Sequence, residues 1–410
     1  MTVFRVLMAH NRYKAPGGED NSTHEEVGLL RSAGHSVDLW EVSNDQIPES
    51  GSIATALNAI WSASATRELR RRLNAQRYDL LHVQNAFPLL SPAILFDAAR
   101  QGIATVQHLR NYRHLCVNAG FFRAGAICKS CAKAVWPWRG IVHKCYRGSR
   151  LASVVPATTV ALHKALGTYT NRVDAFIAIS DHVRAAHIDG GFPADRIHKR
   201  YSAFAPGRQV PFTKRRREIF CAARFVPEKG VDRLIRAWRC RPRNARLTVA
   251  GSGPMQTQLR QLADGDPSIE FAGQLSSEES LDRMANAMAV VNCSVWEEPF
   301  GRTPVEAFSC GVPAIVSNAG GLAESVAHGR NGLIVKPGDE QQLDDALTRI
   351  LTEDGLAAAL GDEALRTHRE KFHPKTILAQ TEQIYARALA RQRGRSNSQM
   401  ELVKCPDSVS

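Results

Sequence analysis

Two carboxylates and a helix start stand out in the second half of the sequence. Glu298 and Glu306 are separated by seven residues in a polar segment that follows the apolar run Ala289–Cys293. Thr303 suits a helix N-cap, Pro304 suits the first helical position, and Glu306 stands where a capping box places a carboxylate. Backbone N–H groups at a helix start can bind an anion, and carboxylates on either side of it can accept hydrogen bonds from hydroxyls. The alternative interpretation makes Glu306 a capping residue and Glu298 a solvated loop residue.

The elements that position these side chains are predicted from apolar runs of four to seven residues with helical patterns between them, which is typical of parallel strands in βαβ units. The expected strands are Val3–Ala9, Val37–Val42, Leu80–Val83, Ala104–His108, Ala175–Ser180, Ile219–Ala223, Leu247–Ala250, Ile269–Ala272, Ala289–Cys293, Ala314–Ser317 and Gly332–Val335. The expected helices are Leu57–Leu73, Ser91–Gln101, Val231–Arg239, Met255–Ala263, Glu278–Met288, Leu343–Leu351 and Thr376–Arg391.

The chain of 410 residues is long enough for two or three domains, and 44% hydrophobic with 23% charged residues excludes wholesale disorder. A linker is expected around Ala203–Arg217. We therefore expect an N-terminal Rossmann-like domain at 1–205, with an insertion at 109–148, and a C-terminal one at 206–375. A helix at 376–392 is expected to pack back on the first domain, and 393–410 to be a disordered tail. Two open α/β domains joined in this way are expected to face each other across a crevice that binds the ligand.

Several ordered motifs carry a resemblance to a known family. The segment EPFGRTPVEAFSCGVPAIVSNAGGLAES, which begins at Glu298, resembles the E-x7-E motif of the retaining glycosyltransferases of family 4, which have the GT-B fold. The segments ARFVPEKG from Ala223 to Gly230, AGSGP from Ala250 to Pro254 and PGGE from Pro16 to Glu19 resemble further family motifs. The resemblance spans about residues 1–390.

The resemblance implies roles on the nucleotide-binding side. Arg224, a forked donor, and Lys229, a point charge, would hold the donor diphosphate, although two such cations near a helix start can also be ordinary surface residues. The amides of Gly17 and Gly18 would approach the phosphates, since no Cβ intervenes. Gly251 and Gly253 would form the turn beside the nucleotide.

The resemblance also implies roles around the transferred sugar. Glu298 would lie near the anomeric carbon and Glu306 would bind the ribose hydroxyls. The amides of Phe300 and Gly301 would meet the sugar hydroxyls, and His108, at a strand end, would contact the donor sugar as a second catalytic residue. The family implies retention, with the donor phosphate accepting the acceptor's proton, and no cofactor is expected to be needed for catalysis. The sequence Asp264-Gly265-Asp266 is therefore interpreted as a turn and not as a metal site.

Four cysteines, Cys116, Cys128, Cys131 and Cys145, have the spacing C-x11-C-x2-C-x13-C. Four thiolates with a central C-x-x-C suit a structural zinc, with His143 or His114 as a replacement ligand; the alternative is a set of reduced, partly buried thiols. The formal net charge is +13, and residues 101–150 hold nine Lys or Arg and no Asp or Glu. Aromatic residues interleave with these cations, which suits either contact with an anionic membrane surface or an inward-facing domain lid.

The function expected from these observations is retaining transfer of a hexose from a UDP- or GDP-linked sugar to a glycan or a lipid-linked acceptor, in cell-surface polysaccharide or glycolipid synthesis. The alternatives are another GT-B nucleotide-sugar enzyme, such as an epimerase, and a zinc-containing nucleic-acid-binding protein. No nucleic-acid module is recognised, and nucleic acid is not an expected partner. With no secretory signal or spanning segment visible, the expected location is the cytoplasm, with contact at the inner membrane face as an extension.

Overall fold

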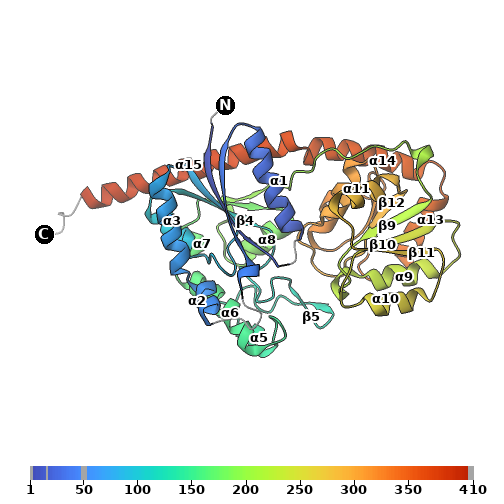
Figure 1. The fold of residues 1–410 in the computed structure, drawn as a ribbon, viewed down its shortest axis with the longest axis horizontal. Coiled ribbons are helices and arrows are strands. Elements are labelled where there is room, and N and C mark those ends of the chain that lie inside the picture. The colour runs from blue at the N-terminus through green and yellow to red at the C-terminus, as the bar shows by residue number, and fades with distance from the viewer. Residues whose placement is uncertain (1–2, 15–16, 48–52, 405–410) are drawn as a thin grey trace. The chain divides into compact units, whose positions relative to one another are not determined.

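Runs of buried β-branched residues alternate with amphipathic segments along the chain, and they form two α/β units in a computed structural model that describes residues 3–14, 17–47 and 53–404. Unit 1 comprises residues 1–120, 129–202 and 377–410, and unit 2 comprises 121–128 and 203–376. Pro16 and residues 405–410 lie outside the described residues. Figure 1 labels the elements along the chain.

The sheet of unit 1 is parallel throughout and has the strand order β2-β1-β3-β4-β7-β8. Its strands are β1 Arg5–Arg12, β2 Ser36–Ser43, β3 Leu80–Asn85, β4 Ala104–Leu109, β7 Ala175–Ala178 and β8 Ile197–Lys199. Its helices are α1 Gly18–Ser32, α2 Ile53–Ile60, α3 Ala63–Ala75, α4 Ala93–Arg100, α5 Trp138–Val142, α6 Arg150–Ala165, α7 Thr168–Asn171 and α8 Asp181–Asp189.

The last helix, α15 (Pro374–Lys404), begins in unit 2 and completes the core of unit 1. Its residues Ile384, Tyr385 and Ala388 pack with Val27 and Leu30 of α1 against the sheet. The predicted disordered tail therefore differs from the structure, in which the helix continues from 393 to Lys404. The segment between 393 and 404 contains no proline, and Pro406 is the first residue that would stop a helix there.

The sheet of unit 2 is also parallel, with the order β11-β10-β9-β12-β13-β14. Its strands are β9 Glu218–Ala222, β10 Arg246–Ala250, β11 Ile269–Gly273, β12 Ala289–Asn292, β13 Ala314–Ser317 and β14 Gly332–Val335. Its helices are α9 Val231–Arg239, α10 Gln256–Ala263, α11 Ser277–Asn286, α12 Arg302–Ser309, α13 Glu340–Thr352 and α14 Leu356–Thr367. Residues 121–128 add an antiparallel hairpin of β5 Phe122–Arg123 and β6 Ala126–Ile127.

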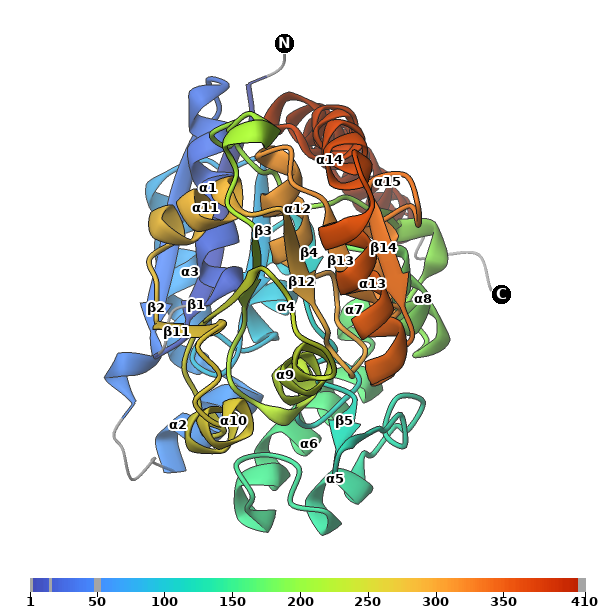
Figure 2. The ribbon, with the colours of Figure 1, turned by 90° about the vertical axis from the view of Figure 1, so that its right-hand side faces the viewer.

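Unit 2 has three layers, because each face of its sheet carries its own apolar core (Figure 2). The larger core joins α9, α10, α13 and α14 to the sheet, and a smaller core joins α11 and α12 to it. A parallel sheet covered on both faces explains why its strands appear in the sequence as continuous apolar runs.

Candidate functional site

The candidate site lies where the strand order of unit 2 changes direction. From β9 the chain builds outward to β10 and β11, and then returns to place β12, β13 and β14 on the other side of β9. Arg224 and Lys229 follow β9, and Glu298 follows the adjacent strand β12. The carboxyl ends of parallel strands at such a switch point form a crevice between loops that point apart, which is where ligands bind in open α/β sheets.

The loops that follow β9 and β12 are bound to each other. The Val295 amide donates to the Glu228 carbonyl at 2.9 Å, and the Cys293 thiol donates to the Gly230 carbonyl at 3.2 Å. Across this junction Lys229 Nζ donates to Glu298 Oε2 at 2.6 Å. The structure therefore brings together two side chains that are 69 residues apart in the sequence and that were both predicted to belong to the site.

Glu298 is buried and accepts hydrogen bonds from three donors on the same oxygen. Besides Lys229, Ser294 Oγ and Trp296 Nε1 each donate to Glu298 Oε2 at 2.9 Å. Burial alone would raise the pKa of Glu298, but the Lys229 ammonium and the two further donors outweigh burial and lower this pKa below its ordinary value. Glu298 is therefore an ionised carboxylate at neutral pH, suited to stabilising positive charge and not to donating a proton.

Ser294 and Trp296 were not among the predicted site residues. Both lie within four residues of Glu298, in the loop that follows β12, so the polar segment itself was the available signal. The Trp296 ring also lies 5.3 Å from Lys229 Nζ, which holds the ammonium by a cation–π contact. Contacts to both Glu298 and Lys229 thus fix the geometry of this ion pair.

The start of α12 differs from the prediction. The helix begins at Arg302 with Gly301 as its N-cap, so Thr303 is not the cap and Pro304 stands at the third helical position. Gly301 has φ +82°, a conformation that favours glycine, and a Cβ there would come within 2.5 Å of Leu322 Cδ1. The tight turn at Gly301 therefore sets the helix start two residues earlier than the threonine and proline signals indicated.

Glu306 is partly exposed to solvent, whereas Phe300 is buried. Glu306 is not a capping residue: its carboxylate accepts from Arg302 Nε at 3.0 Å, and its side chain is 24% exposed. Phe300 is buried, with its ring near those of Phe204 and Phe372 at centroid distances of 6.3 and 6.2 Å. This aromatic cluster anchors the backbone between Glu298 and Gly301. The exposed part of Glu306 leaves it able to accept from a hydroxyl.

The glycine turn after β10 supports the loop that carries Arg224. A Cβ at Gly251 would lie 1.9 Å from the Ala223 carbonyl oxygen, and one at Gly253 would lie 2.6 Å from the Phe225 carbonyl oxygen. These glycines therefore let two backbone segments cross in close contact, while the Arg224 side chain remains exposed. The structure thus gives Gly251 and Gly253 a packing reason, beside the nucleotide role that the sequence predicted.

In unit 1, His108 is buried, and it is among the residues that line a cavity at the carboxyl ends of β3 and β4. It lies on β4 on the same side as Ala104 and Val106, which face the core under α1 and α15. Its ring stacks on His82 with centroids 5.5 Å apart, and its Nδ1 lies 3.7 Å from Glu26 Oε2. Burial lowers the pKa of His108 well below its ordinary value. The period-two pattern of β4 directs this side chain toward α1 and α15, and its contact with the donor sugar stays a prediction.

His108 belongs to a buried polar cluster that the sequence did not predict. Glu26 lies 2.9 Å from Arg200 Nη2 and 3.2 Å from Arg110 Nη2. Burial would raise the pKa of Glu26, but Arg200, His82 and Arg110 lower it to about 2. Although Glu26, His82 and His108 place possible ligand atoms within 4.8 Å of one another, two guanidinium groups at this carboxylate oppose a metal cation. The cluster is therefore a structural ion-pair network.

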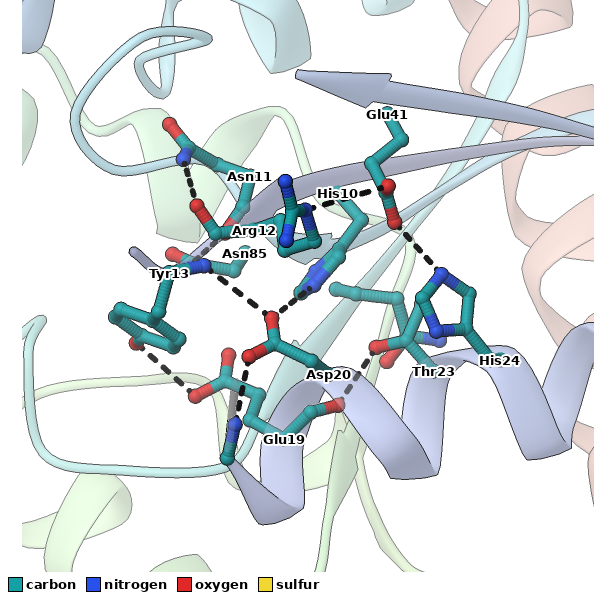
Figure 3. Close-up of polar contacts among 12 residues, drawn as sticks. His10, Asn11, Arg12, Tyr13, Glu19, Asp20, Thr23, His24, Glu41 and Asn85 are labelled. Atoms are coloured by element: carbon teal, nitrogen blue, oxygen red, sulfur yellow. Dashed lines mark hydrogen bonds and ion pairs between the residues drawn. The ribbon is translucent and has the colours of Figure 1, made fainter. Parts of the chain in front are cut away.

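The predicted phosphate-binding glycines lie at the start of α1, beside a cluster of polar contacts (Figure 3). The Gly17 amide donates to Asp20 Oδ2 at 2.9 Å, and His10 Nε2 lies 2.8 Å from the other oxygen of Asp20. Gly18 is the exposed first residue of α1, and Glu19 follows it. The Gly17 amide is thus already paired with a carboxylate, and the contact of Gly17 and Gly18 with the donor phosphates stays a prediction.

A cavity opens at the carboxyl ends of β3 and β4 in unit 1, next to the switch point between β1 and β3, and it encloses about 590 Å³ including space open to solvent. Arg113 lies 4.6 Å from the Phe87 ring centroid, and Asn111 Nδ2 donates to Glu19 Oε2 at 3.2 Å. Val160 of α6 also lines the cavity. Amide, guanidinium and carboxylate groups beside an aromatic ring suit a polyhydroxylated ligand.

The four cysteines fall in both units. Cys116 and Cys131 are buried and Cys145 is half-buried, all in unit 1, whereas Cys128 lies in the hairpin segment of unit 2. The Cys116 thiol donates to Asn118 Oδ1 at 2.9 Å. Zinc binding by these cysteines stays a prediction. Within the part of the chain that the structure describes, no helix combines the length and the apolar character needed to cross a bilayer.

Two protein-family models match adjoining parts of the chain. The model described as Glycosyltransferase Family 4 matches residues 16–202, and the model described as Glycosyl transferases group 1 matches residues 207–367. Together the two matches cover most of the chain and meet close to the boundary between its two units.

Individual relatives match about half of the chain. It is 30% identical over 210 residues to a GDP-mannose-dependent monoacylated alpha-(1-6)-phosphatidylinositol monomannoside mannosyltransferase of Corynebacterium glutamicum, covering 47% of this chain and 53% of that protein. It is 32% identical over 204 residues to a glycogen synthase of Mycobacterium tuberculosis, covering 47% and 48%. An exopolysaccharide phosphotransferase of Streptomyces coelicolor is 28% identical over 227 residues, 53% of this chain and 24% of that protein. The chain thus spans about half or less of the length of these curated relatives.

Solved structures share the fold over nearly the whole chain. The sucrose-phosphate synthase of Thermosynechococcus elongatus superimposes with a TM-score of 0.69 and 18% identity, covering 94% of this chain and 99% of that one. Anabaena HepE in complex with UDP gives a TM-score of 0.66 at 18% identity, covering 93% and 99%. The same protein has also been solved with UDP-glucose. At this identity the likeness concerns the fold, which is the two-unit α/β fold of the GT-B enzymes.

Proposed function

This chain belongs to glycosyltransferase family 4, and on that premise we propose that it transfers a hexose, with retention, from a nucleotide-diphosphate sugar to a glycan or lipid-linked acceptor. The observation that carries the proposal is the Lys229–Glu298 pair at the switch point of unit 2, with a distance of 2.6 Å between Nζ and Oε2. It places a cation and an ionised carboxylate side by side where the fold binds ligands. The reaction would serve cell-surface polysaccharide or glycolipid synthesis.

Breaking the bond between the sugar and the diphosphate requires charge stabilisation on both fragments. The electron pair of the C1–O bond goes to the diphosphate, for which Arg224 offers a planar fork of donors. The Lys229 ammonium has three N–H donors, of which one goes to Glu298, so two remain for a phosphate oxygen. On the other fragment the Glu298 carboxylate would stabilise the positive charge that develops at C1.

The acceptor completes the reaction from the same face as the leaving diphosphate. Its hydroxyl oxygen forms the new bond to C1, and its proton passes to the departing diphosphate oxygen, so no protein base is needed. Glu306 would bind the ribose hydroxyls through its exposed oxygen, and the amides of Phe300 and Gly301 would orient the sugar. His108 lines the cavity of unit 1, and the sugar contact that the resemblance implies for it stays a prediction.

The choice of donor nucleotide is open between UDP and GDP. Support for UDP comes from the solved HepE complexes with UDP and UDP-glucose, and support for GDP comes from relatives named GDP-mannose-dependent. Ser252 Oγ donates to Gln274 Oε1 at 3.1 Å beside the glycine turn, and this exposed pair is our candidate for contact with the base.

The test combines nucleotide binding with turnover. UDP or GDP is expected to raise the Tm of the protein, and one sugar of a UDP- and GDP-linked panel is expected to be transferred or slowly hydrolysed. Arg224→Met is expected to weaken nucleotide binding roughly tenfold or more, because it removes a charge-assisted contact. Arg246→Met is the matched control, since Arg246 begins β10 and therefore lies at the amino ends of the strands, away from the carboxyl ends that form the site. Stabilisation by oligonucleotides with none by nucleotides, or epimerised sugar as the product, would contradict the proposal.

We also propose that the four cysteines bind a structural zinc, with no part in catalysis. The proposal rests on the spacing C-x11-C-x2-C-x13-C and on the burial of Cys116 and Cys131. Protein purified without oxygen is expected to carry one zinc per chain, and Cys128→Ser with Cys131→Ser is expected to lose it. Cys240→Ser, an exposed cysteine outside the segment, is the control. Absence of stoichiometric zinc from the unaltered protein would end this proposal.

A further inference from the structure

The helix α2 carries an apolar strip that faces solvent. Ile53 and Leu57 lie four residues apart, on one side of the helix, and are 82% and 61% exposed. Trp61, which directly follows the helix, is 40% exposed and stacks on His163 of α6 with ring centroids 5.9 Å apart. The opposite side of α2 is anchored to α6, where Thr159 Oγ1 donates to the Ala59 carbonyl at 3.2 Å.

The neighbouring helices α5 and α6 extend this apolar strip. On α5, Trp138 and Val142 are 52% and 48% exposed, and at the start of α6 Leu151 is 84% exposed. Trp136, which precedes α5, is 43% exposed. The helix α6 packs against both α2 and α5, and Figure 1 shows the three helices grouped together. We call the exposed apolar side chains of α2, α5, α6 and the segment 135–137 the α2–α5–α6 face.

Exposed apolar side chains are concentrated on this face. Among the described residues, twelve large apolar side chains are exposed, and ten of them lie between 53 and 61 or between 135 and 166. The other two are Val3 and Ile127. Soluble surfaces normally scatter such residues singly, and a contiguous group marks a contact with a partner or a membrane.

The surroundings of the face are basic. Residues 98–173 contain twelve Lys or Arg and no Asp or Glu, and α2 contains no acidic residue. Arg139, Lys144, Arg147 and Arg150 are all exposed along α5 and the turn into α6. A surface that combines tryptophans and aliphatic side chains with a rim of cations matches the interface of an anionic bilayer.

We propose that the α2–α5–α6 face docks the protein on an anionic lipid bilayer, with α2 and α6 lying in the interface and the cations against lipid phosphates. Charge favours this occupant over a second copy of the chain, since two such basic faces would repel each other. The consequence for the reaction rests on the proposed function: docking would favour an acceptor that is itself anchored in the lipid. Docking itself depends only on the surface.

The helix α6 connects this face to the cavity of unit 1. Its exposed side begins with Leu151, while Pro156, Thr159 and Val160 on its buried side line that cavity. A single helix thus has one side on the proposed lipid contact and the other on a pocket with polar groups. An acceptor with a lipid tail and a polar head would find complementary chemistry on the two sides.

The experiment measures vesicle binding by flotation, with no nucleotide or sugar present. The protein is expected to float with vesicles of phosphatidylcholine and phosphatidylglycerol at low salt, and to remain in solution with phosphatidylcholine alone. Leu57→Glu and Leu151→Glu are each expected to lower the partition coefficient roughly tenfold. Arg147→Gln and Arg150→Gln are each expected to lower it about fivefold at low salt and less at high salt.

Val3→Glu is the matched control, because Val3 is 60% exposed and lies outside the α2–α5–α6 face. It precedes the amino end of β1, whereas the loops that lead to α2 and α5 leave the carboxyl ends of the strands. Failure to float at low salt, equal binding to both vesicle types, or an equal loss with Val3→Glu would each overturn the proposal. A dimer seen by light scattering that Leu151→Glu dissociates would assign the face to a second copy and overturn it as well. Stabilisation by UDP or GDP, measured without vesicles, reports separately on the proposed function.

Discussion

Replacing Glu298 by glutamine tests the site with the smallest change in shape. The glutamine carbonyl can still accept from Lys229, Ser294 and Trp296, which now donate to Oε2 at 2.6, 2.9 and 2.9 Å. What the substitution removes is the negative charge. Because charge-assisted hydrogen bonds are roughly twice as strong as neutral ones, each donor is expected to lose about 1 kcal/mol, and the folded protein about 3 kcal/mol.

The effect on turnover is expected to be larger than the effect on binding. Without the carboxylate, nothing from this side chain stabilises positive charge at C1, and loss of one preorganised electrostatic group costs roughly 10²- to 10³-fold in kcat. The Lys229 ammonium is released from its charged partner, so affinity for the nucleotide is expected to stay the same or to rise. The assay is release of UDP or GDP from the donor sugar that the unaltered enzyme uses, with nucleotide affinity measured by titration.

The matched control is Glu278→Gln, an exposed carboxylate in the first turn of α11 of the same unit. Its kcat and its Tm are expected to match those of the unaltered enzyme. The reasoning would be refuted if Glu298→Gln kept kcat within a factor of about three, or if it lost nucleotide affinity while the bound donor still reacted at the normal rate.

Three further predictions concern stability. Gly301→Ala is expected to lower the free energy of unfolding by about 2 kcal/mol or more, because φ is +82° and a Cβ would meet a neighbouring leucine. Gly329→Ala is the control, since Gly329 has φ +73° but open space around it, so that only the backbone cost remains. Equal changes in Tm for the two variants would contradict this prediction. Burial lowers the pKa of His82 to about 4, so between pH 6.5 and 4 the unfolded state binds a proton that the folded state does not. His82 alone is therefore expected to lower the free energy of unfolding by about 2 kcal/mol between pH 7 and pH 5, within a larger fall to which the buried His108 and His187 also contribute. In urea titrations, His82→Gln is expected to make that fall smaller by this amount. Arg200→Met is expected to lower the free energy of unfolding by about 3 kcal/mol, because it leaves the Glu26 carboxylate buried with one fewer cation. A loss below about 1 kcal/mol in the same urea titrations would show that the fold does not need this ion pair.

Most of the sheet structure could be predicted from the sequence, because strands buried on both faces appear as continuous apolar runs. Every predicted run corresponds to a strand, while β8 (Ile197–Lys199) was missed because it is short and mostly polar. The single helix predicted at Leu57–Leu73 is two helices, since the Ser62 hydroxyl accepts from the Ala65 amide at 3.2 Å and starts α3 there. Local capping chemistry thus divided a segment whose apolar period suggested one helix.

The candidate site was predictable where its residues belong to motifs in loops that follow strands, and not where the residues carry no such motif. Lys229 and Glu298 both follow strands, and their motifs pointed to one site. Glu26, Arg110 and Arg200 come from α1, the end of β4 and the end of β8, and nothing in their spacing indicates that they meet. Long-range burial of charge is a property of the packed fold, which explains why the sequence did not indicate the contacts of His108 with His82 and Glu26.

The return of the chain in α15 has a consequence for how the protein is made. The main segment of unit 2, residues 203–376, is synthesised between the second and third segments of unit 1, 129–202 and 377–410. Unit 1 needs Ile384 and Tyr385 for its core, so the half that leaves the ribosome first is the half that finishes folding last. A nascent or truncated chain that ends before α15 exposes an apolar sheet face and lacks the Tyr385 hydroxyl that meets His82 at 2.8 Å. Such a chain is a natural client for chaperones and proteases.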